Sequence, residues 1–309
     1  MTTNRFKKIL VPVSLEIEST TAFNQALFLK QKLGAEITLL HVVPNVGGIS
    51  EVFQPDLKSE AEKKGMVRLV RFAKMNFEGK IPEHVKLRVE VGNHVSIINS
   101  ITSNESFDLL VLNRRNRIDA LPERYKSNNV SQIVRESSCP VISVNNRWTS
   151  KGIRNILVPV DISRQSRDLL NWSILLGKIF NANIKLLAAL TVKIDLTQSL
   201  AYKKSRLMKD LIESEGVSCS VSIVEKENLG KNEALIEEAR KISADMLLVQ
   251  GFQDLMFSNT QSERLLVDFL KYSSRPIFSL GIKEESFISS LLKVNKNSEV
   301  LLNEFESDE

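Results

Sequence analysis

Histidine and cysteine side chains, which supply most general bases, thiolate nucleophiles and metal ligands, are few and widely separated in this chain. The histidines are His41, His84 and His94, and the cysteines are Cys139 and Cys219. None of them has the CxxC or HExxH spacing of a zinc site. A nucleophile elbow, a Walker lysine loop and a GxGxxG loop are also absent from the sequence. The sequence therefore predicts no catalytic residue and no metal site.

One acidic residue stands where a ligand could be recognised. Asp161 ends an apolar run, and Ser163 follows two residues later. A carboxylate at the end of a buried strand can accept hydrogen bonds from a ligand, but Asp and Ser at this spacing can equally cap the next helix. Capping is the favoured interpretation, and recognition of a ligand is the alternative.

Basic residues gather in one segment of the first half of the chain. Arg114, Arg115 and Arg117 are followed closely by Arg124 and Lys126. Guanidinium groups bind phosphate and carboxylate oxygens through paired hydrogen bonds, so this segment is a candidate anion-binding loop. The favoured alternative is a solvated loop whose arginines serve solubility or a domain contact.

Charge is distributed unevenly along the chain. The 309 residues have a formal net charge of +5, but residues 283–309 hold three lysines against seven acids, a net of −4. The rest of the chain therefore carries +9. Aromatic residues make up only 6% and are not interleaved with a basic run. A stacking surface for single-stranded nucleic acid is thus not indicated.

The apolar runs are too short to cross a bilayer, which takes about 18–20 residues. Residues 1–8 lead into a short strand-like run and lack the apolar core of a signal peptide. Two separated cysteines fit a reducing compartment. We expect no membrane association and a cytoplasmic location.

The chain repeats itself. The segment Ile9–Val13 reads ILVPV, and the same five residues recur 147 positions later as Ile156–Val160. Matches in the same order, each on an apolar run, indicate a duplication. The further pairs are 35–40 with 182–187, 108–112 with 245–249, and 139–142 with 275–278.

Each copy alternates short apolar runs with longer amphipathic stretches. Nearly continuous runs of Ile, Val and Leu are typical of strands buried on both sheet faces. This βα alternation predicts an α/β fold with a doubly wound parallel sheet in each copy. The expected strands are 7–14, 36–43, 85–91, 107–113 and 139–144 in copy one, and 155–161, 184–190, 218–225, 245–250 and 276–280 in copy two. The expected helices of copy one are 18–34, 57–78, 94–103 and 127–137.

The predicted domains follow from the repeat. Domain one covers 1–146, domain two covers 152–282, and a short polar linker joins them. The tail, 283–309, has apolar residues that could form one or two short amphipathic helices on a partner surface, or it could be a frayed terminus. Gly34 is expected to cap a helix, and Trp172 and Phe180 are expected to pack in a core or interface.

These residues resemble the universal stress protein family in its tandem form. The resemblance rests on Ile9–Val13, Leu39–Val43, Phe107–Leu112 and Ser138–Val144, each echoed in copy two, and it spans residues 5 to about 281. It implies an adenine nucleotide alpha hydrolase-like fold with strand order 3-2-1-4-5 and domains paired about a two-fold axis. Some members of the family bind ATP at the carboxyl ends of the strands.

The resemblance also implies where a nucleotide would sit. An Asp would end strand one, a residue ending strand two would pack on the nucleoside, and glycines after strand four would let the backbone cradle the phosphates. Copy one departs from this pattern throughout. It has Ser14 at the Asp position, Asn113 and Asn116 at the glycine positions, and Ser127 and Asn128 at the final Gly-Ser pair.

Copy two keeps the Asp, as Asp161, but departs from the pattern at the glycine positions. Gln250 and Gln253 take the first two glycine positions with Gly251 beside them, and Glu263 and Arg264 replace the Gly-Ser pair. The nucleotide-binding residues implied for copy two are Pro159, Val160, Asp161, Ala189, Gly251 and Gln253.

Two main functions remain open. The favoured hypothesis is a non-catalytic stress-response protein whose two domains pair within the chain, and which acts through itself or an unidentified protein partner. The alternative is an ATP- or other adenine-nucleotide-binding protein that uses domain two, with weak ATP hydrolysis. Nucleotidyl or thiolation chemistry is a third hypothesis that rests on fold analogy alone.

Overall fold

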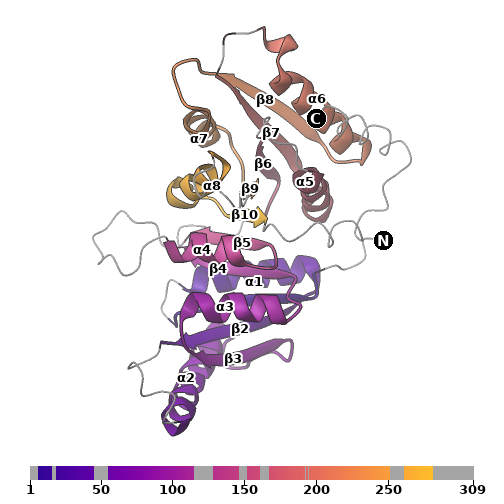
Figure 1. Cartoon of the computed structure of the whole chain (residues 1–309). Helices are drawn as coiled ribbons and strands as arrows, with labels where there is room; N and C mark the ends of the chain where they lie inside the picture. The colour runs from indigo at the N-terminus through magenta and orange to yellow at the C-terminus, as the bar shows by residue number, and fades with distance from the viewer. Residues whose placement is uncertain are drawn as a thin grey trace. The chain divides into compact units, whose positions relative to one another are not determined.

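The protein is described here from a computed structural model. The model describes residues 6–15, 19–44, 55–114, 128–145, 152–160, 167–191, 193, 195–250 and 261–280. The chain divides into two compact units, Met1–Ser150 and Lys151–Glu309, which we call domain one and domain two. Figure 1 shows the elements of both.

Domain one is a five-stranded parallel sheet with helices on both faces. Its strands run in the order β3-β2-β1-β4-β5, and every neighbouring pair is parallel. The elements are β1 (Lys8–Pro12), α1 (Ser19–Leu33), β2 (Glu36–Val43), α2 (Pro55–Asn76), β3 (Val85–Val91), α3 (His94–Asn104), β4 (Leu109–Arg114), α4 (Asn128–Glu136) and β5 (Val141–Asn145).

Domain two repeats this plan. Its parallel strands have the order β8-β7-β6-β9-β10, which is again 3-2-1-4-5 within the domain. The elements are β6 (Asn155–Pro159), α5 (Arg167–Phe180), β7 (Asn183–Leu190), the short 3-10 helix η3 (Leu196–Gln198), α6 (Leu200–Ser214), β8 (Cys219–Glu225), α7 (Lys231–Lys241), β9 (Met246–Gln250), α8 (Gln261–Tyr272) and β10 (Ile277–Leu280). The predicted α/β class and the implied strand order are both confirmed.

The helices cover the sheets as right-handed crossovers require. In domain one, α1 packs on β1, β4 and β5, α2 packs on β2 and β3, and α3 lies beside α4. Phe23 of α1 contacts Phe72 of α2 edge-on, with ring centroids 6.3 Å apart. The central strands are buried on both faces: Ile9, Leu10 and Val11 of β1 are all fully enclosed. This double burial is why these runs are continuously apolar.

Several predicted boundaries differ from the observed ones by one or a few residues, and two of them illustrate the local structure at an element end. Strand β1 ends at Pro12, two residues before the predicted end, although Val13 N–H still donates to the Leu40 carbonyl at 2.8 Å. Helix α2 ends at Asn76 because Glu78 and Gly79 adopt left-handed backbone, with φ of +51° and +97°. Gly79 N–H then closes the helix end on the Lys74 carbonyl.

Two smaller predictions about single residues are confirmed. Gly34 has φ of +65°, and its N–H donates to the Lys30 carbonyl, so it caps α1. Trp172 is fully buried and packs on Phe278, with ring centroids 5.1 Å apart.

Cys139 and Cys219 are both free and buried, and burial raises the pKa of the Cys219 thiol to about 12. The tail, 283–309, lies outside the described residues.

Candidate functional site

The carboxyl ends of the strands form the candidate site in each domain, because open α/β sheets hold ligands at that edge. In domain one, β1 continues into Val13 and Ser14. Val13 is buried, Ser14 is exposed, and Leu15 follows with φ of +63°. A left-handed conformation is uncommon for leucine, and it occurs here directly after Ser14, which stands where the family pattern has its ligand-binding Asp.

His41 lies near the end of β2, beside β1. Its ring is only 6% exposed, and Nδ1 lies 3.1 Å from the carbonyl oxygen of Val13. Because that oxygen can only accept, Nδ1 must carry the proton. Burial lowers the pKa of His41, and the nearby charge of Arg68 lowers it further. His41 is therefore a neutral imidazole that ties the end of β2 to the residue that follows β1.

His94 adds a second imidazole near this corner. It is the first residue of α3, and its pKa is lowered first by desolvation and then by the charge of His41. Because both pKa values are lowered, these two imidazoles do not form a cationic anion site at neutral pH. Neither ring was among the residues predicted for ligand binding.

Arg114 is the last residue of β4 and is only 3% exposed. The prediction of a solvated position is therefore wrong for this arginine, whereas Arg115 and Arg117 lie outside the described residues. Burial lowers the pKa of Arg114 to about 10, so the guanidinium stays protonated at neutral pH. Its neighbour in the β4–β5 register is Asn145, which is also buried. Domain one thus encloses a cation at the end of β4.

Domain two has the same edge with different side chains. Val160 N–H donates to the Leu187 carbonyl at 2.8 Å, which repeats the Val13–Leu40 bond of domain one. Pro159 and Ala189 are buried on the adjacent strands β6 and β7. Ala188 takes the place of His41, so the bond that the imidazole makes in domain one has no counterpart at this position. An apolar methyl group therefore replaces a polar ring here.

One polar atom at this edge has no hydrogen-bond partner among the residues that the structure describes. Gln250 ends β9, and its Oε1 is buried without a hydrogen bond. A buried amide oxygen without a donor costs free energy, typically about 1–3 kcal/mol. The structure therefore brings Pro159, Val160, Ala189 and Gln250 to one edge, whereas Asp161, Gly251 and Gln253 lie outside the described residues.

A repeated carboxylate clamp at the opposite edge was not predicted. Asp108 Oδ2 accepts from the N–H groups of Lys7 and Lys8 at 2.7 and 2.9 Å. Asp245 Oδ2 accepts from Arg154 and Asn155, both at 2.9 Å. The recurrence of Asp at the start of the fourth apolar run was the available signal. Each clamp fixes the entry into the first strand of its domain.

The described residues hold no group of three or more His, Cys, Asp or Glu that could bind a metal ion. Across the same described ranges, no helix combines the length and apolarity that membrane spanning requires.

The family comparison matches residues 5–145 to the universal stress protein family. Curated protein sequences give no match. Three solved structures illustrate the similarity in fold. A universal stress protein from Archaeoglobus fulgidus DSM 4304 has 17% identity and a TM-score of 0.62, covering 91% of this chain and 99% of its own. A putative universal stress protein from Pseudomonas aeruginosa UCBPP-PA14 has 13% identity and a TM-score of 0.54, covering 97% and 99%.

The third is the universal stress protein from Archaeoglobus fulgidus in complex with dAMP. It has 12% identity and a TM-score of 0.32, and it covers 41% of this chain and 96% of its own. The first two matches extend over both domains, so they show that the tandem α/β arrangement occurs in solved universal stress proteins.

Proposed function

From the premise that residues 5–145 are a universal stress protein domain, we propose that this chain is a tandem, non-catalytic stress-response protein that acts through interaction. The observation that carries the proposal is the buried Arg114 at the end of β4. A phosphate cradle at this position needs backbone N–H groups and no bulky side chain. Domain one instead places a guanidinium there.

The histidines of the candidate edge also support a structural role. A general base needs access to its substrate and a pKa near the working pH. The His41 ring is buried and donates from Nδ1 to the Val13 carbonyl, and its pKa lies below the usual value because of that burial. Its bonding and burial suit it to stabilise the edge rather than to transfer protons.

We further propose that the two domains pair within one chain, as an intramolecular counterpart of a dimer. The duplication and the short linker support this, since the linker keeps the two domains at a high effective concentration. Light scattering tests it. A chain that pairs internally remains monomeric over a wide concentration range, whereas reversible dimerisation would indicate pairing between copies.

The second candidate function is binding of ATP or another adenine nucleotide by domain two. The specific observation in its favour is Gln250, whose buried Oε1 is available to a donor such as an exocyclic amine. Pro159, Val160 and Ala189 supply an apolar floor beside it. In this proposal Asp161, Gly251 and Gln253 complete the site, and weak hydrolysis would accompany binding.

Equilibrium dialysis with radiolabelled ATP separates the two functions. The first proposal predicts no stoichiometric binding at millimolar nucleotide. Binding of one nucleotide per chain that disappears in Asp161→Ala and in Gln250→Leu would overturn it and support the second. Ser14→Ala, at the matched position of domain one, is the control. Phosphate release from ATP by the same variants measures any hydrolysis.

A further inference from the structure

The two domains have matched edge strands that differ in charge. Strand β3 in domain one and strand β8 in domain two each pair with a single neighbour among the described strands. Figure 1 shows β3 beside β2 and β8 beside β7. The registers match the two edges residue by residue, because Ile37 pairs with Val85 and its counterpart Ile184 pairs with Cys219. An edge strand exposes unpaired backbone groups that another extended chain can bind.

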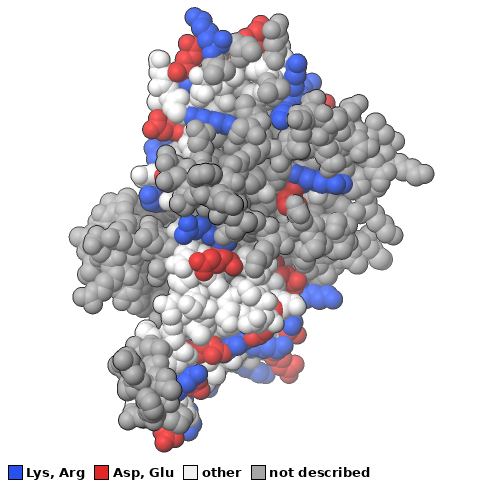
Figure 2. Space-filling view, viewed as in Figure 1, with Lys and Arg blue, Asp and Glu red and all other residues white. Residues whose placement is uncertain are grey.

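Charged side chains cover one face of β3. Lys86, Arg88 and Glu90 occupy alternate positions and therefore lie on the same face of the sheet. Lys86 pairs with Glu36 at 2.7 Å, while Arg88 pairs with Glu90 at 2.8 Å and also with Glu105. Figure 2 shows acidic and basic side chains intermingled over this part of domain one. Charges at these positions oppose the addition of another strand, because it would have to remove water from them.

Strand β8 has uncharged residues at the matched positions. Ser220, Ser222 and Val224 stand where β3 has its three charged residues. Both serines are exposed, and Val224 is half-buried. The strand contains no proline, and it pairs with β7 over seven consecutive residues without a bulge. It therefore lacks the features that usually prevent an edge from accepting another strand.

The hydrogen bonds show which backbone groups of β8 face away from β7. In a parallel sheet, successive residues direct their N–H and C=O groups alternately to one side and to the other. The Ser218 carbonyl accepts from Ile184 and the Lys226 N–H donates to Leu190, so the even-numbered residues face β7. The outward groups belong to the odd-numbered residues, Cys219, Val221, Ile223 and Glu225. No other described residue forms a hydrogen bond with these outward groups.

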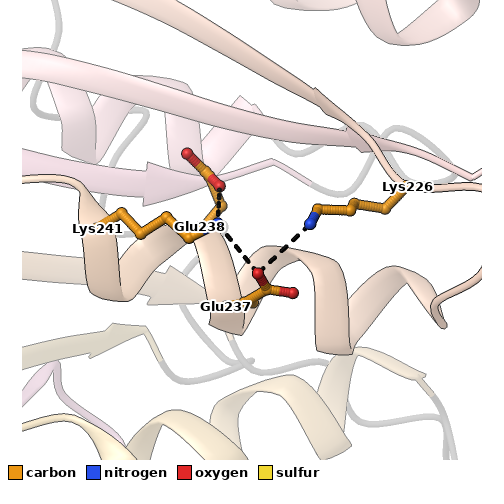
Figure 3. A network of polar contacts seen from close by, with 4 residues as sticks. All are labelled: Lys226, Glu237, Glu238 and Lys241. Atoms are coloured by element: carbon orange, nitrogen blue, oxygen red, sulfur yellow. Dashed lines mark hydrogen bonds and ion pairs between the residues drawn. The ribbon is translucent and has the colours of Figure 1, made fainter.

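The carboxyl end of this edge is acidic. Glu225, the last residue of β8, is exposed and forms no ion pair with another described residue. The adjacent Lys226 points to α7 instead, where its Nζ lies 3.4 Å from Oε1 of Glu237 (Figure 3). Lys241 pairs with the same carboxylate at 3.0 Å. The charge of Glu225 is therefore available to a basic side chain of a partner.

The other end of the edge also has carboxylates nearby. Burial raises the pKa of the Cys219 thiol, and the charges of Glu213 and Asp210 on α6 raise it further. Lys209, which lies 3.6 Å from Glu213, opposes this effect only in part. An acidic side chain placed opposite Cys219 would therefore be repelled.

We propose that the outer edge of β8 binds an extended segment of a partner protein, which joins the sheet as one more strand. The segment has small or β-branched side chains beside Ser220, Ser222 and Val224, and a lysine or arginine beside Glu225. Backbone hydrogen bonds supply most of the affinity, and the side chains select the sequence. This binding mode rests on the proposed function, action through interaction, and it specifies the surface and the class of partner.

Other occupants fit this edge less well. Its outward N–H and C=O groups recur at every second residue, about 6.7 Å apart, which is the repeat of an extended polypeptide. The strand has no lysine or arginine that could hold a phosphate group. A second copy of β8, paired antiparallel about Ser222, would place its Glu225 opposite Cys219, close to Glu213 and Asp210. Repulsion between carboxylates opposes that arrangement.

Residue-resolved hydrogen exchange of the full chain, measured by NMR with and without a synthetic peptide, tests the proposal. The probe is the peptide KTVTVTVK, which has β-branched residues between basic ends. At about 1 mM peptide, exchange of the outward N–H groups of Val221 and Ile223 should slow about tenfold. Leu87 and Val89, at the matched positions of β3, are the internal control and should not change. Unchanged exchange at Val221 and Ile223 would overturn the proposal.

A proline peptide and a charge graft supply the matched controls. The peptide KTPTPTPK has the same charge but cannot donate from its prolines, so it should give no protection. A triple variant transfers the charge pattern of β3 to β8: Ser220→Lys, Ser222→Arg and Val224→Glu. It should bind KTVTVTVK about tenfold more weakly in fluorescence anisotropy, while the N–H groups bonded to β7 stay protected. Equal binding by the variant and the original chain would contradict recognition by this edge.

Charge exchange tests the role of Glu225 separately. Glu225→Lys should prefer the peptide ETVTVTVE, whereas the original chain should prefer KTVTVTVK. The same preference in both proteins would contradict a basic partner residue beside Glu225.

Measurements without peptide test whether the edge is free. Protection of Val221 and Ile223 that rises with chain concentration would show that a second copy covers β8. Protection at every concentration would show that the chain covers its own edge, and either result would overturn the partner strand. Failure of peptide binding without ATP binding would overturn this binding mode alone, whereas stoichiometric ATP binding would overturn the proposed function.

Discussion

The two domains have the same strand order but differ in the side chains of their helices and strand ends. In both, a carboxylate at the start of the fourth strand holds the backbone that enters the first. At matched positions elsewhere, Gln25 stands against Trp172, and His41 stands against Ala188. The two copies therefore share the sheet and its clamp, while the helices and the candidate site at the carboxyl ends of the strands differ. The residues shared by the two domains are those that specify the fold, and the residues that differ are those available for a separate function.

The pair Gln25 and Trp172 shows the divergence inside the core. Both side chains are fully buried. Trp172 packs on Phe278 at 5.1 Å, whereas neither polar atom of Gln25 has a hydrogen-bond partner. Domain two gains from this position the burial of a large ring. Domain one bears the cost of an unsatisfied amide there.

The largest effect is expected from Trp172→Ala. Removal of a fully buried ring from beside Phe278 leaves a cavity, so the free energy of unfolding should fall by about 3–5 kcal/mol. Hydrogen exchange in urea, followed on peptides of β6–β10 and of β1–β5, measures the loss in each domain. Trp172→Phe, which keeps a ring, should lose less. An equal loss in both sets of peptides would show that the two domains unfold as one cooperative unit, and it would contradict a separate role of Trp172 in domain two.

The carboxylate clamp should give equal effects in the two domains. Asp108→Ala and Asp245→Ala each remove an acceptor of two backbone N–H groups, and each should cost about 2 kcal/mol. The same exchange experiment compares them. Asp→Asn at either position keeps one acceptor oxygen and should recover part of the loss. A large effect in only one domain would show that the clamp is not an equivalent feature.

Sequence reasoning predicted all ten strands, because buried parallel strands leave continuous apolar runs. The strand order came from the family resemblance, since the pattern of one chain does not say which strands are neighbours. The side chains of the candidate site were harder to predict. Arg114 was assigned to a solvated loop, yet it ends β4 and is buried. Its position on the chain was visible, but the burial of a guanidinium depends on what packs around it.

Gln25→Leu should stabilise domain one. The substitution replaces a buried amide that lacks hydrogen bonds with an apolar side chain of similar size, and a gain of about 1 kcal/mol is expected. Asn24→Leu, on the exposed side of the same helix, is the matched control and should change little. Urea unfolding of the two variants compares them. A loss of stability in Gln25→Leu would mean that the amide is satisfied in solution.

The histidines should make domain one more sensitive to mild acid than domain two, because all three lie in domain one. Burial lowers the pKa of His41 and of His94, and burial together with the charge of Lys30 lowers that of His84. Lys30 Nζ lies 2.5 Å from Nε2 of His84, so this bond requires a neutral ring. Protonation of any of the three therefore opposes folding.

The direction of the pH effect follows from proton linkage. The unfolded histidines titrate near their ordinary pKa of about 6.5, and the folded ones titrate lower. Between these values the unfolded chain binds more protons, so stability is complete above about pH 6.5 and falls as the pH drops toward the folded pKa. The effect is the smallest of the four because it acts through partial protonation. His41→Gln should reduce the pH dependence of exchange in β1–β5 and leave β6–β10 unchanged. An identical pH profile in the variant would show that His41 does not contribute to the greater acid sensitivity of domain one.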